Sequence, residues 1–364
     1  MTGDWVSGPE TLTEEELGAN RRNFYADCLA NKLDTDEFWQ SRMPDHSKIK
    51  TPMLSTANWG GQGLHPRGNF EGFVRSASNH KWLEVHGIEH WTHFYTDYGI
   101  DLQKRFFGHF LKGEDTGWLQ NQPKVQLQIR YPGEIFVERH ENEWPLARTD
   151  WTKYYIHPDT MTISTEKQVT ESSAEYGGFS DGLTFLSDPL EADLEITGPL
   201  ASKLWVSSET NDADLFLVLR AFSPDMKEVT FQGALDPHTP LAQGWLRCSH
   251  RKLDKDLTLP YRPYHTHDEI QPLNKDETYE VDVEVWPTCI VIPKGYRLGF
   301  SVRGKDYVYP GDSGTDFGEY AGWTGCGLFK HDDPVDRPAE IFGGTVKLHT
   351  GADRQAYIML PIIP

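Results

Sequence analysis

Two short apolar segments, each followed at once by a polar loop, constrain the fold of this chain more than any other feature. Residues 52–57 (PMLSTA) and 81–85 (KWLEV) have the length and composition of buried parallel strands, and loops rich in glycine and polar residues follow both. In open α/β sheets the loops at the carboxyl ends of parallel strands carry the catalytic groups. The sequence therefore predicts a short parallel sheet whose two loops meet at one edge.

The second loop, residues 86–91 (HGIEHW), presents histidine just after a strand, where an α/β-hydrolase keeps its catalytic base. A helix is predicted over residues 101–112 (DLQKRFFGHFLK), and Gly113 can end it. Its predicted apolar face consists of Leu102, Phe106, Phe107, Phe110 and Leu111. In the α/β-hydrolase fold the catalytic residues follow the chain order nucleophile, acid, histidine. The turn that carries the serine nucleophile therefore belongs upstream of residue 50. Nothing in residues 1–50 resembles one.

The flanking sequence divides into a helical start and a β-rich remainder. Residues 10–42 predict helices, beginning at Thr11 or Thr13 with glutamates in the first turn. Further along, residues 125–129 (VQLQI) and 279–286 (YEVDVEVW) alternate strictly between apolar and polar side chains, as strands with one buried face do.

Many short strands with no helices between them favour a sandwich or a jelly roll. We therefore predict two domains of different class. Residues 1–120 are expected to form part of an α/β-hydrolase domain, with cap-like helices at 10–42. Residues 123–364 are expected to form an all-β domain, a β-sandwich of the jelly-roll type.

Composition limits the environment and the partners of the chain. The 55 acidic and 35 basic residues among 364 give a formal charge of -20, which opposes binding to nucleic acid and to anionic membranes. No apolar stretch is long enough for a transmembrane helix, and the N-terminus lacks the pattern of a signal peptide. We expect a soluble, cytoplasmic protein.

The four cysteines, Cys28, Cys248, Cys289 and Cys326, are widely scattered and show no Cys-x-x-Cys spacing. Cysteines scattered in this way indicate neither a zinc ribbon nor a disulfide scaffold. We expect free thiols, and we expect no bound metal and no other cofactor.

A series of motifs matches a known family in order and in spacing. They are residues 182–185 (GLTF), 189–199 (PLEADLEITGP), 204–208 (LWVSS), 212–216 (DADLF), 244–247 (GWLR), 249–251 (SHR), 262–265 (RPYH) and 295–298 (GYRL). Residues 50–120 resemble the end of the catalytic domain of the X-Pro dipeptidyl-peptidase and cocaine-esterase-like (CocE/NonD) hydrolases, and residues 123–364 resemble their C-terminal jelly-roll domain. The resemblance covers almost the whole chain, but only the second half of such an enzyme.

This resemblance implies a catalytic role for one histidine. Residues 87–90 (GIEH) fall on the Gly-Pro-Trp-x-His-type loop of the family, which makes His90 the expected general base, with His86 in place of the usual glycine. Imidazole suits the role because its unperturbed pKa is close to neutrality. The alternative interpretation is a histidine in a polar loop without a chemical role.

The carboxylate that orients this histidine is not at its usual place. Relatives carry Trp-x-Asp after the first of the two strands, whereas this chain has Trp59-Gly-Gly61, so Gly61 occupies the aspartate position. Either Glu71 or Glu89 replaces the missing acid, or a neutral group orients the imidazole. The ordinary interpretation of Glu71 is a solvated helix residue, and that of Glu89 is a loop residue that points elsewhere.

Three other patterns are rejected as sites. Residues 178–182 (GFSDG) contain an elbow-like string, but no buried strand precedes it and no helix follows, so Ser180 is not the expected nucleophile. His86 and His90 fit a His-x-x-Glu-His zinc pattern, which requires a helix where this chain has just left a strand. Residues 265–268 (HTHD) are interpreted as a polar loop that pairs with neighbouring backbone.

The sequence favours a partial serine hydrolase, a class that transfers the acyl group of a peptide, amide or ester to water. The chain alone is expected to be inactive, because it lacks a nucleophile; its substrate, a small molecule or a peptide, requires an N-terminal half. One alternative is a non-catalytic β-sandwich module that binds carbohydrate or a partner protein. Another is a structural subunit that completes a second polypeptide. Homo-oligomerisation is left open.

Overall fold

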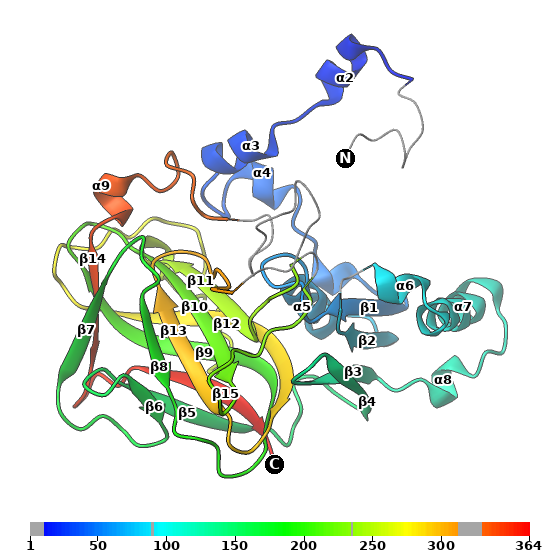
Figure 1. Cartoon of the computed structure of the whole chain (residues 1–364). Helices are drawn as coiled ribbons and strands as arrows, with labels where there is room; N and C mark the ends of the chain where they lie inside the picture. Colours follow the sequence, from blue (N-terminus) through cyan, green and yellow to red (C-terminus); the bar gives the residue numbers. More distant parts are fainter. Residues whose placement is uncertain (1–10, 89–90, 234–235, 312–329) are drawn as a thin grey trace. The chain divides into compact units, whose positions relative to one another are not determined.

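The computed structural model describes residues 11–88, 91–233, 236–311 and 330–364 (Figure 1). Their contacts define two compact units, Met1–Met43 and Pro44–Pro364. No described helix is both long enough and apolar enough to cross a bilayer.

Three short helices form the described part of the first unit, and side-chain caps begin the first two of them. These helices are α2 (Glu14–Asn20), α3 (Phe24–Ala30) and α4 (Glu37–Gln40). The Thr13 hydroxyl accepts a bond from the backbone N–H of Glu16 at 3.2 Å, and the Glu16 carboxylate accepts one from the backbone N–H of Thr13 at 2.9 Å. This reciprocal pair satisfies two amides at the start of α2. The helices predicted between residues 10 and 42 are confirmed, and their role as a cap stays a prediction.

A parallel sheet opens the second unit, as the two apolar segments predicted. Its strands are β1 (Met53–Asn58), β2 (Lys81–His86) and β3 (Val125–Tyr131), with β4 (Ile135–Glu141) antiparallel beside β3. The helical segments of this part are η1 (His46–Lys48), α5 (Pro66–Arg75), α6 (Thr92–Tyr95), α7 (Asp97–Lys112) and α8 (Trp118–Asn121). The sheet continues across the domain boundary predicted near residue 123.

Strand β2 is buried on both faces, and its alternation assigns each side chain to one of two cores. Leu83 and Val85 belong to the cluster that contains the α5 phenylalanines. Trp82 belongs instead to the cluster formed with α7 and α8. Because side chains two residues apart share a face of a strand, Glu84 and His86 lie on the α7 side with Trp82.

Helix α7 ends at Gly113, which has the left-handed φ of 71° expected of a C-terminal glycine. Leu102 and Phe106 are buried, as predicted, but Phe107 is 48% exposed and Leu111 is 77% exposed. The predicted single apolar face was therefore too wide. Leu111 lies nine positions after Leu102. In a helix with ~3.6 residues per turn, this places the two side chains on roughly opposite sides.

The remaining strands form a β-rich region in which most pairs are antiparallel (Figure 1). They are β5 (Asp150–His157), β6 (Thr162–Ser164), β7 (Ser172–Gly177), β8 (Leu183–Leu186), β9 (Leu194–Ser208), β10 (Asp214–Phe222), β11 (Ala242–Arg247), β12 (Tyr279–Ile292), β13 (Arg297–Arg303), β14 (Thr345–Thr350) and β15 (Tyr357–Ile363). Two short helices, η2 (Cys248–His250) and α9 (Ala339–Phe342), interrupt them. The strands predicted from residues 125 and 279 are confirmed.

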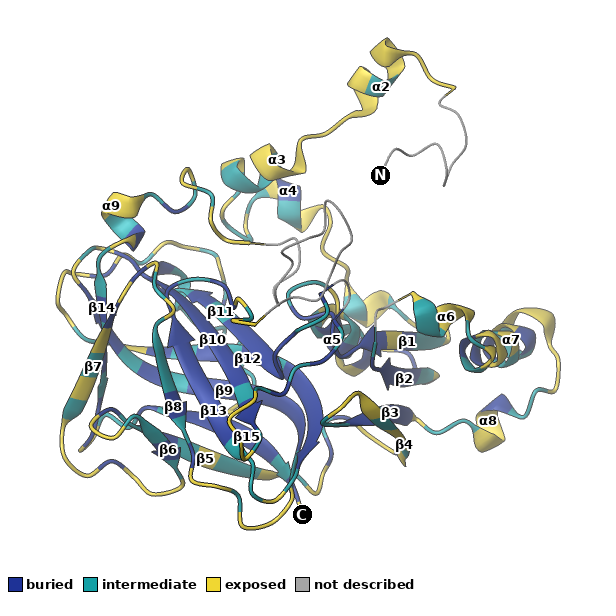
Figure 2. Ribbon diagram, in the orientation of Figure 1, coloured by how far each residue is buried: buried dark blue, intermediate teal, exposed yellow. Residues whose placement is uncertain are grey.

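The core of this region consists mainly of buried apolar side chains on its strands, many of which are dark blue in Figure 2. Strand β12 illustrates how the sequence builds it, because Val281, Val283 and Val285 alternate inward and are 0–1% exposed. The thiols of Cys248 and Cys289 are buried and free, and Cys28 is free as well. Cys326 lies outside the described residues.

Strand β3 of the parallel sheet pairs with β12 of the β-rich region, with Arg130 opposite Ile290, and this joins the two. The Arg130 guanidinium is fully buried there and donates to the backbone oxygens of Cys289 at 2.9 Å and of Leu241 at 3.0 Å. Its burial lowers the pKa of Arg130 to about 10. The loop after β1 is packed as closely, because a Cβ atom on Gly60 would lie 2.4 Å from the Cα of Gly233.

Candidate active site

The loops that follow β1 and β2 lie side by side at the carboxyl edge of the sheet. The backbone N–H of Trp59 donates to the carbonyl of His86 at 2.8 Å. The Asn58 amide donates to the carbonyl of Gly87 at 3.0 Å and also to that of Ile88. The predicted meeting of the two loops is therefore confirmed.

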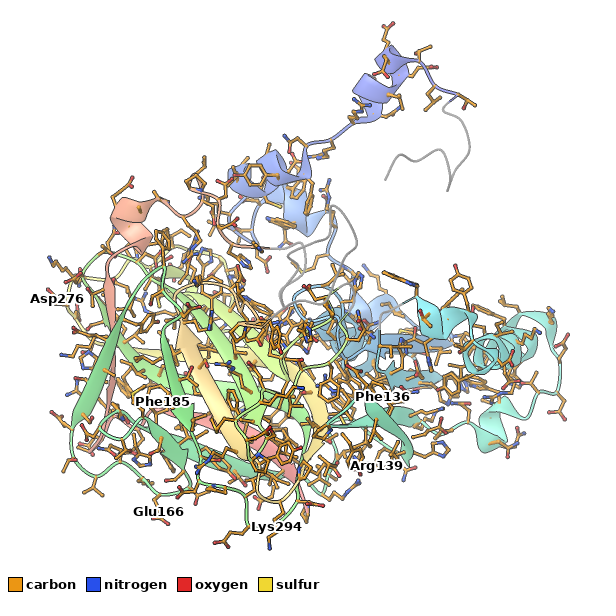
Figure 3. The ribbon with its side chains drawn as sticks, in the orientation of Figure 1. Phe136, Arg139, Glu166, Phe185, Asp276 and Lys294 are labelled. Carbon is orange, nitrogen blue, oxygen red and sulfur yellow. The ribbon has the colours of Figure 1, made fainter. Side chains whose placement is uncertain are left out.

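Glu89 and His90 lie outside the described residues, so their catalytic roles stay predictions. The start of their loop is well fixed. The backbone N–H of Gly87 donates to the side-chain oxygen of Gln128 on β3 at 3.0 Å. A Cβ atom on Gly87 would lie 2.0 Å from the ring of Phe136, a β4 residue labelled in Figure 3, so a larger residue there would require this ring to move.

Gly61, at the position expected to carry the aspartate, is tightly enclosed. A Cβ atom on Gly61 would lie 3.1 Å from Cδ of Pro66, so a carboxylate at this place would require the neighbouring chain to shift. Glu71 on α5, one of the two candidate acids, is buried, which corrects its ordinary interpretation as a solvated helix residue. The Glu71 carboxylate pairs with Arg262 and lies 3.8 Å from the guanidinium of Arg75, so its described ion pairs give it a structural role.

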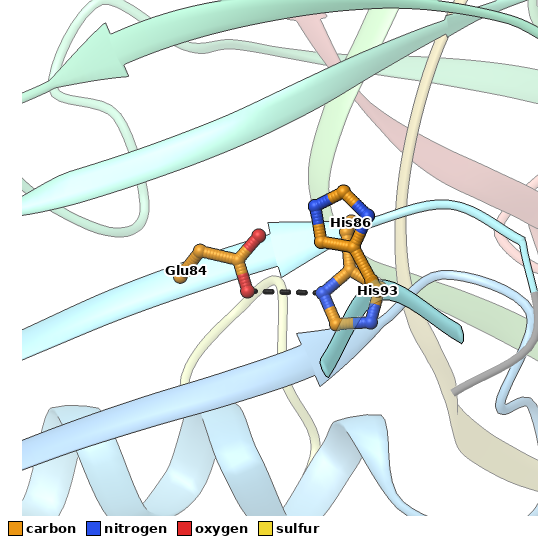
Figure 4. Close-up of side chains that lie close together, drawn as sticks. All are labelled: Glu84, His86 and His93. Carbon is orange, nitrogen blue, oxygen red and sulfur yellow. Dashed lines mark hydrogen bonds and ion pairs between the residues drawn. The ribbon is translucent and has the colours of Figure 1, made fainter. Parts of the chain in front are cut away.

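Sequence reasoning missed a cluster of Glu84, His86 and His93, whose side chains Figure 4 shows close together. The Glu84 carboxylate lies 2.9 Å from Nδ1 of His86. The imidazole of His93 stacks on that of His86, with ring centroids 4.6 Å apart and an interplanar angle of 23°. The cluster thus combines an oriented histidine with a second imidazole at the end of β2.

Polar groups from α7 and β3 hold this cluster in place. The Tyr98 hydroxyl donates to the second oxygen of Glu84 at 3.3 Å, and Gln126 donates to the Tyr98 oxygen at 2.6 Å. Burial raises the pKa of Tyr98 far above its usual range. Burial, together with the neighbouring His86, lowers the pKa of His93, which favours a neutral imidazole.

A cavity of about 190 Å³ opens beside these side chains. Its lining combines the polar groups of Glu84, His86 and His93 with apolar side chains from β1 and α7. Imidazole nitrogens at such a place can accept a proton or bind a metal ion.

Ser180, rejected as a nucleophile from the sequence, does not lie in a nucleophile elbow. Ser180 lies in the turn between β7 and β8, where its hydroxyl oxygen accepts a bond from the backbone N–H of Gly182 at 3.1 Å. A turn between two such strands is not the strand-to-helix elbow that exposes a nucleophile.

The loop of residues 265–268 also pairs with backbone, as its interpretation requires. Nε2 of His265 lies 2.9 Å from the carbonyl oxygen of Asp282, and the ring is almost fully buried. Burial lowers the pKa of His265 to about 4 from an ordinary value of 6.5. Since the carbonyl can only accept, the neutral ring donates to it through Nε2–H.

We expect this histidine to reduce stability in acid. Between pH 6.5 and about 4 the unfolded chain binds a proton at His265 that the folded chain does not bind, so the free energy of unfolding falls as the pH falls through this window. The loss is on the order of 3 kcal/mol at full effect. Urea unfolding of His265→Gln across this window should show a weaker pH dependence than wild type, and the exposed His140→Gln should not. An equal slope in all three proteins would contradict the assignment.

The fold and this edge define a class of protein, an α/β-hydrolase-type sheet joined to a β-rich domain. The family model of the X-Pro dipeptidyl-peptidase C-terminal non-catalytic domain matches residues 116–315. The chain belongs to this family of X-Pro dipeptidyl-peptidases and CocE/NonD hydrolases.

Known relatives are hydrolases. The cocaine esterase of Rhodococcus sp. (strain MB1 Bresler) is 24% identical to the chain over an alignment of 416 positions, gaps included. This alignment covers 97% of this chain and 64% of the esterase. A CocE/NonD family hydrolase from Staphylococcus aureus has a solved structure that superimposes with a TM-score of 0.83 at 28% identity, covering 94% of this chain and 59% of that one. An aminopeptidase from a marine sediment Thaumarchaeota archaeon shares the fold, with a TM-score of 0.68 at 14% identity over 96% of this chain and 62% of its own. The chain therefore spans less than two thirds of the length of these relatives.

Proposed function

We propose that this chain supplies the histidine-bearing end of a serine-hydrolase site, which transfers the acyl group of an ester, amide or peptide to water. The parallel strands β1 to β3 belong to the catalytic domain in this proposal, and the β-rich region forms its jelly-roll domain. The carrying observation is the meeting of the loops after β1 and β2 at one edge of the sheet, where hydrolases of this fold place acid and base.

The sheet itself indicates where the nucleophile would enter. Among the described strands, β1 pairs with β2 alone and stands at the end of the strand order. Parallel sheets are normally buried and extended by further strands, because an unpaired edge leaves backbone N–H and C=O groups without partners. A polypeptide that continues the sheet beside β1 would bring its own strand ends, and a serine elbow among them, to the loops of residues 59–63 and 87–91.

His90 would then act as the base of the reaction. It would accept the proton of the serine hydroxyl while the oxygen attacks the acyl carbon, and it would return that proton to the leaving group. Water would repeat the cycle on the acyl-enzyme and release the acid.

Reconstitution tests this proposal. The S. aureus hydrolase, divided so that its second part matches this chain, is first reassembled from its own two parts as a positive control. Its first part is then combined with this chain, and hydrolysis of a chromogenic ester is measured. We expect activity in the mixture and none with His90→Ala, whereas the exposed His140→Ala should leave the rate unchanged.

The opposite result would favour the second function. A mixture that assembles but stays inactive, beside an active positive control, would contradict the hydrolase proposal. The chain would then be better described as a non-catalytic module that binds carbohydrate or a partner protein.

A further inference from the structure

We propose that His86 and His93 bind one zinc ion, and that Glu84 orients His86 for this role. Each of the three side chains offers one potential ligand atom, and these atoms lie within 4.8 Å of one another. Imidazole nitrogen is among the preferred ligands of Zn²⁺ in proteins. This site is independent of His90 and of the proposed hydrolase function.

The first argument is a buried nitrogen without a partner. Because a carboxylate can only accept, the bond between Glu84 and Nδ1 of His86 places the proton of the neutral ring on Nδ1. The lone pair is then on Nε2, and this atom is buried with no hydrogen-bond partner among the described residues. His86 is only 7% exposed, so a group inside the adjoining cavity must satisfy Nε2, and leaving it unpaired is costly.

A carboxylate behind a histidine is the usual support of a metal-binding imidazole. A ligating histidine donates its other N–H to such a group, which fixes the ring and makes the free nitrogen more basic. Glu84 provides this support, and the Tyr98 hydroxyl holds its second oxygen at 3.3 Å. The arrangement therefore presents Nε2 of His86 in a fixed orientation.

The second ligand is the imidazole stacked on the first. Nε2 of His93 lies 3.4 Å from the amide nitrogen of Gln128, a long contact in which the amide is the donor and the imidazole nitrogen carries the lone pair. The χ2 torsion of histidine is broad, so the half-buried His93 ring can turn this nitrogen toward His86. The cavity of about 190 Å³ beside both rings has room for water molecules that complete a four-coordinate ion.

Binding would connect two elements that the chain separates by one loop. His86 is the last residue of β2, and His93 belongs to α6, so the ion would close the segment of residues 87–92 at both ends. Its role would be structural, because the ion would tie the end of β2 to α6.

Zinc titration of the chelator-treated chain tests the site. We expect one zinc ion per chain in competition with a chromogenic chelator, and a rise of the melting temperature with zinc, because the ion binds the folded state. His93→Phe keeps a stacked ring but removes the nitrogen, and it should weaken binding at least ~100-fold; Glu84→Gln should weaken it ~10–100-fold. If His93→Phe does not fold, as judged by urea unfolding, His93→Gln replaces it.

A second pair of histidines provides the matched control. Nδ1 of His250 and Nδ1 of His267 are 3.1 Å apart in an exposed contact, so zinc held by this pair would be adventitious. His267→Phe should leave the affinity unchanged. The proposal is overturned if wild type binds no zinc, if His93→Phe binds it as tightly as wild type, or if His267→Phe alone abolishes binding.

Discussion

The chain alone is expected to hydrolyse p-nitrophenyl acetate and Gly-Pro p-nitroanilide at the background rate. Removal of the nucleophile from a serine hydrolase typically costs on the order of 10⁶-fold in turnover. Residual catalysis after such a loss comes from the oxyanion hole, but that hole uses the residue after the nucleophile and an early loop. Ser180 lies in a turn between two strands and so provides no elbow from which such a hole could be built.

Initial rates for wild type and His90→Ala provide the comparison, and a fluorophosphonate probe reports any reactive serine. We expect equal rates and no labelling. Robust turnover that disappears in His90→Ala would refute the need for an external nucleophile. A labelled serine would then identify the group that the sequence did not reveal.

Trp59→Ala is expected to cause the largest loss of stability among single substitutions in the parallel sheet, about 3–5 kcal/mol. Trp59 is 0% exposed and lies with its ring centroid 5.7 Å from that of Phe70 and 6.3 Å from that of Trp144. Its indole N–H donates to the carbonyl of Gln128 at 2.8 Å, which the alanine would leave without this partner. Truncation therefore opens a cavity and removes a buried hydrogen bond.

Urea unfolding measures this loss, and Trp91→Ala is the matched control. Trp91 is 46% exposed, so its truncation should change the free energy of unfolding by less than about 1 kcal/mol. Similar changes in the two variants would show that Trp59 does not support the core as described.

The sequence was sufficient to predict the elements that depend on local pattern. Strands β1 and β2 follow from short apolar runs that end in glycine-rich loops, and the end of α7 follows from Gly113. Strand β12 follows from strict alternation. Each of these signals acts within a few residues of the chain, which is why a single sequence carries them.

The candidate site depends on information of another kind. Strand β2 is buried on both faces, so its alternation could not tell which face would hold Glu84 and His86. His93 reaches the cluster from α6, a helix of four residues that is too short to show periodicity. The ion pair between Glu71 and Arg262 joins residues 191 positions apart, and no local pattern predicts such a pair.

The joint at β3 and β12 has a consequence for how the chain unfolds. Cys289 and Val291 of β12 belong to the same apolar cluster as Trp59 and Val125, so melting of the β-rich region would remove part of the interior of the parallel sheet. Regions that share an interior lose it together, in a single cooperative transition. Cleavage between α8 and β3 should therefore leave the two pieces associated, in contrast to domains that a flexible linker connects.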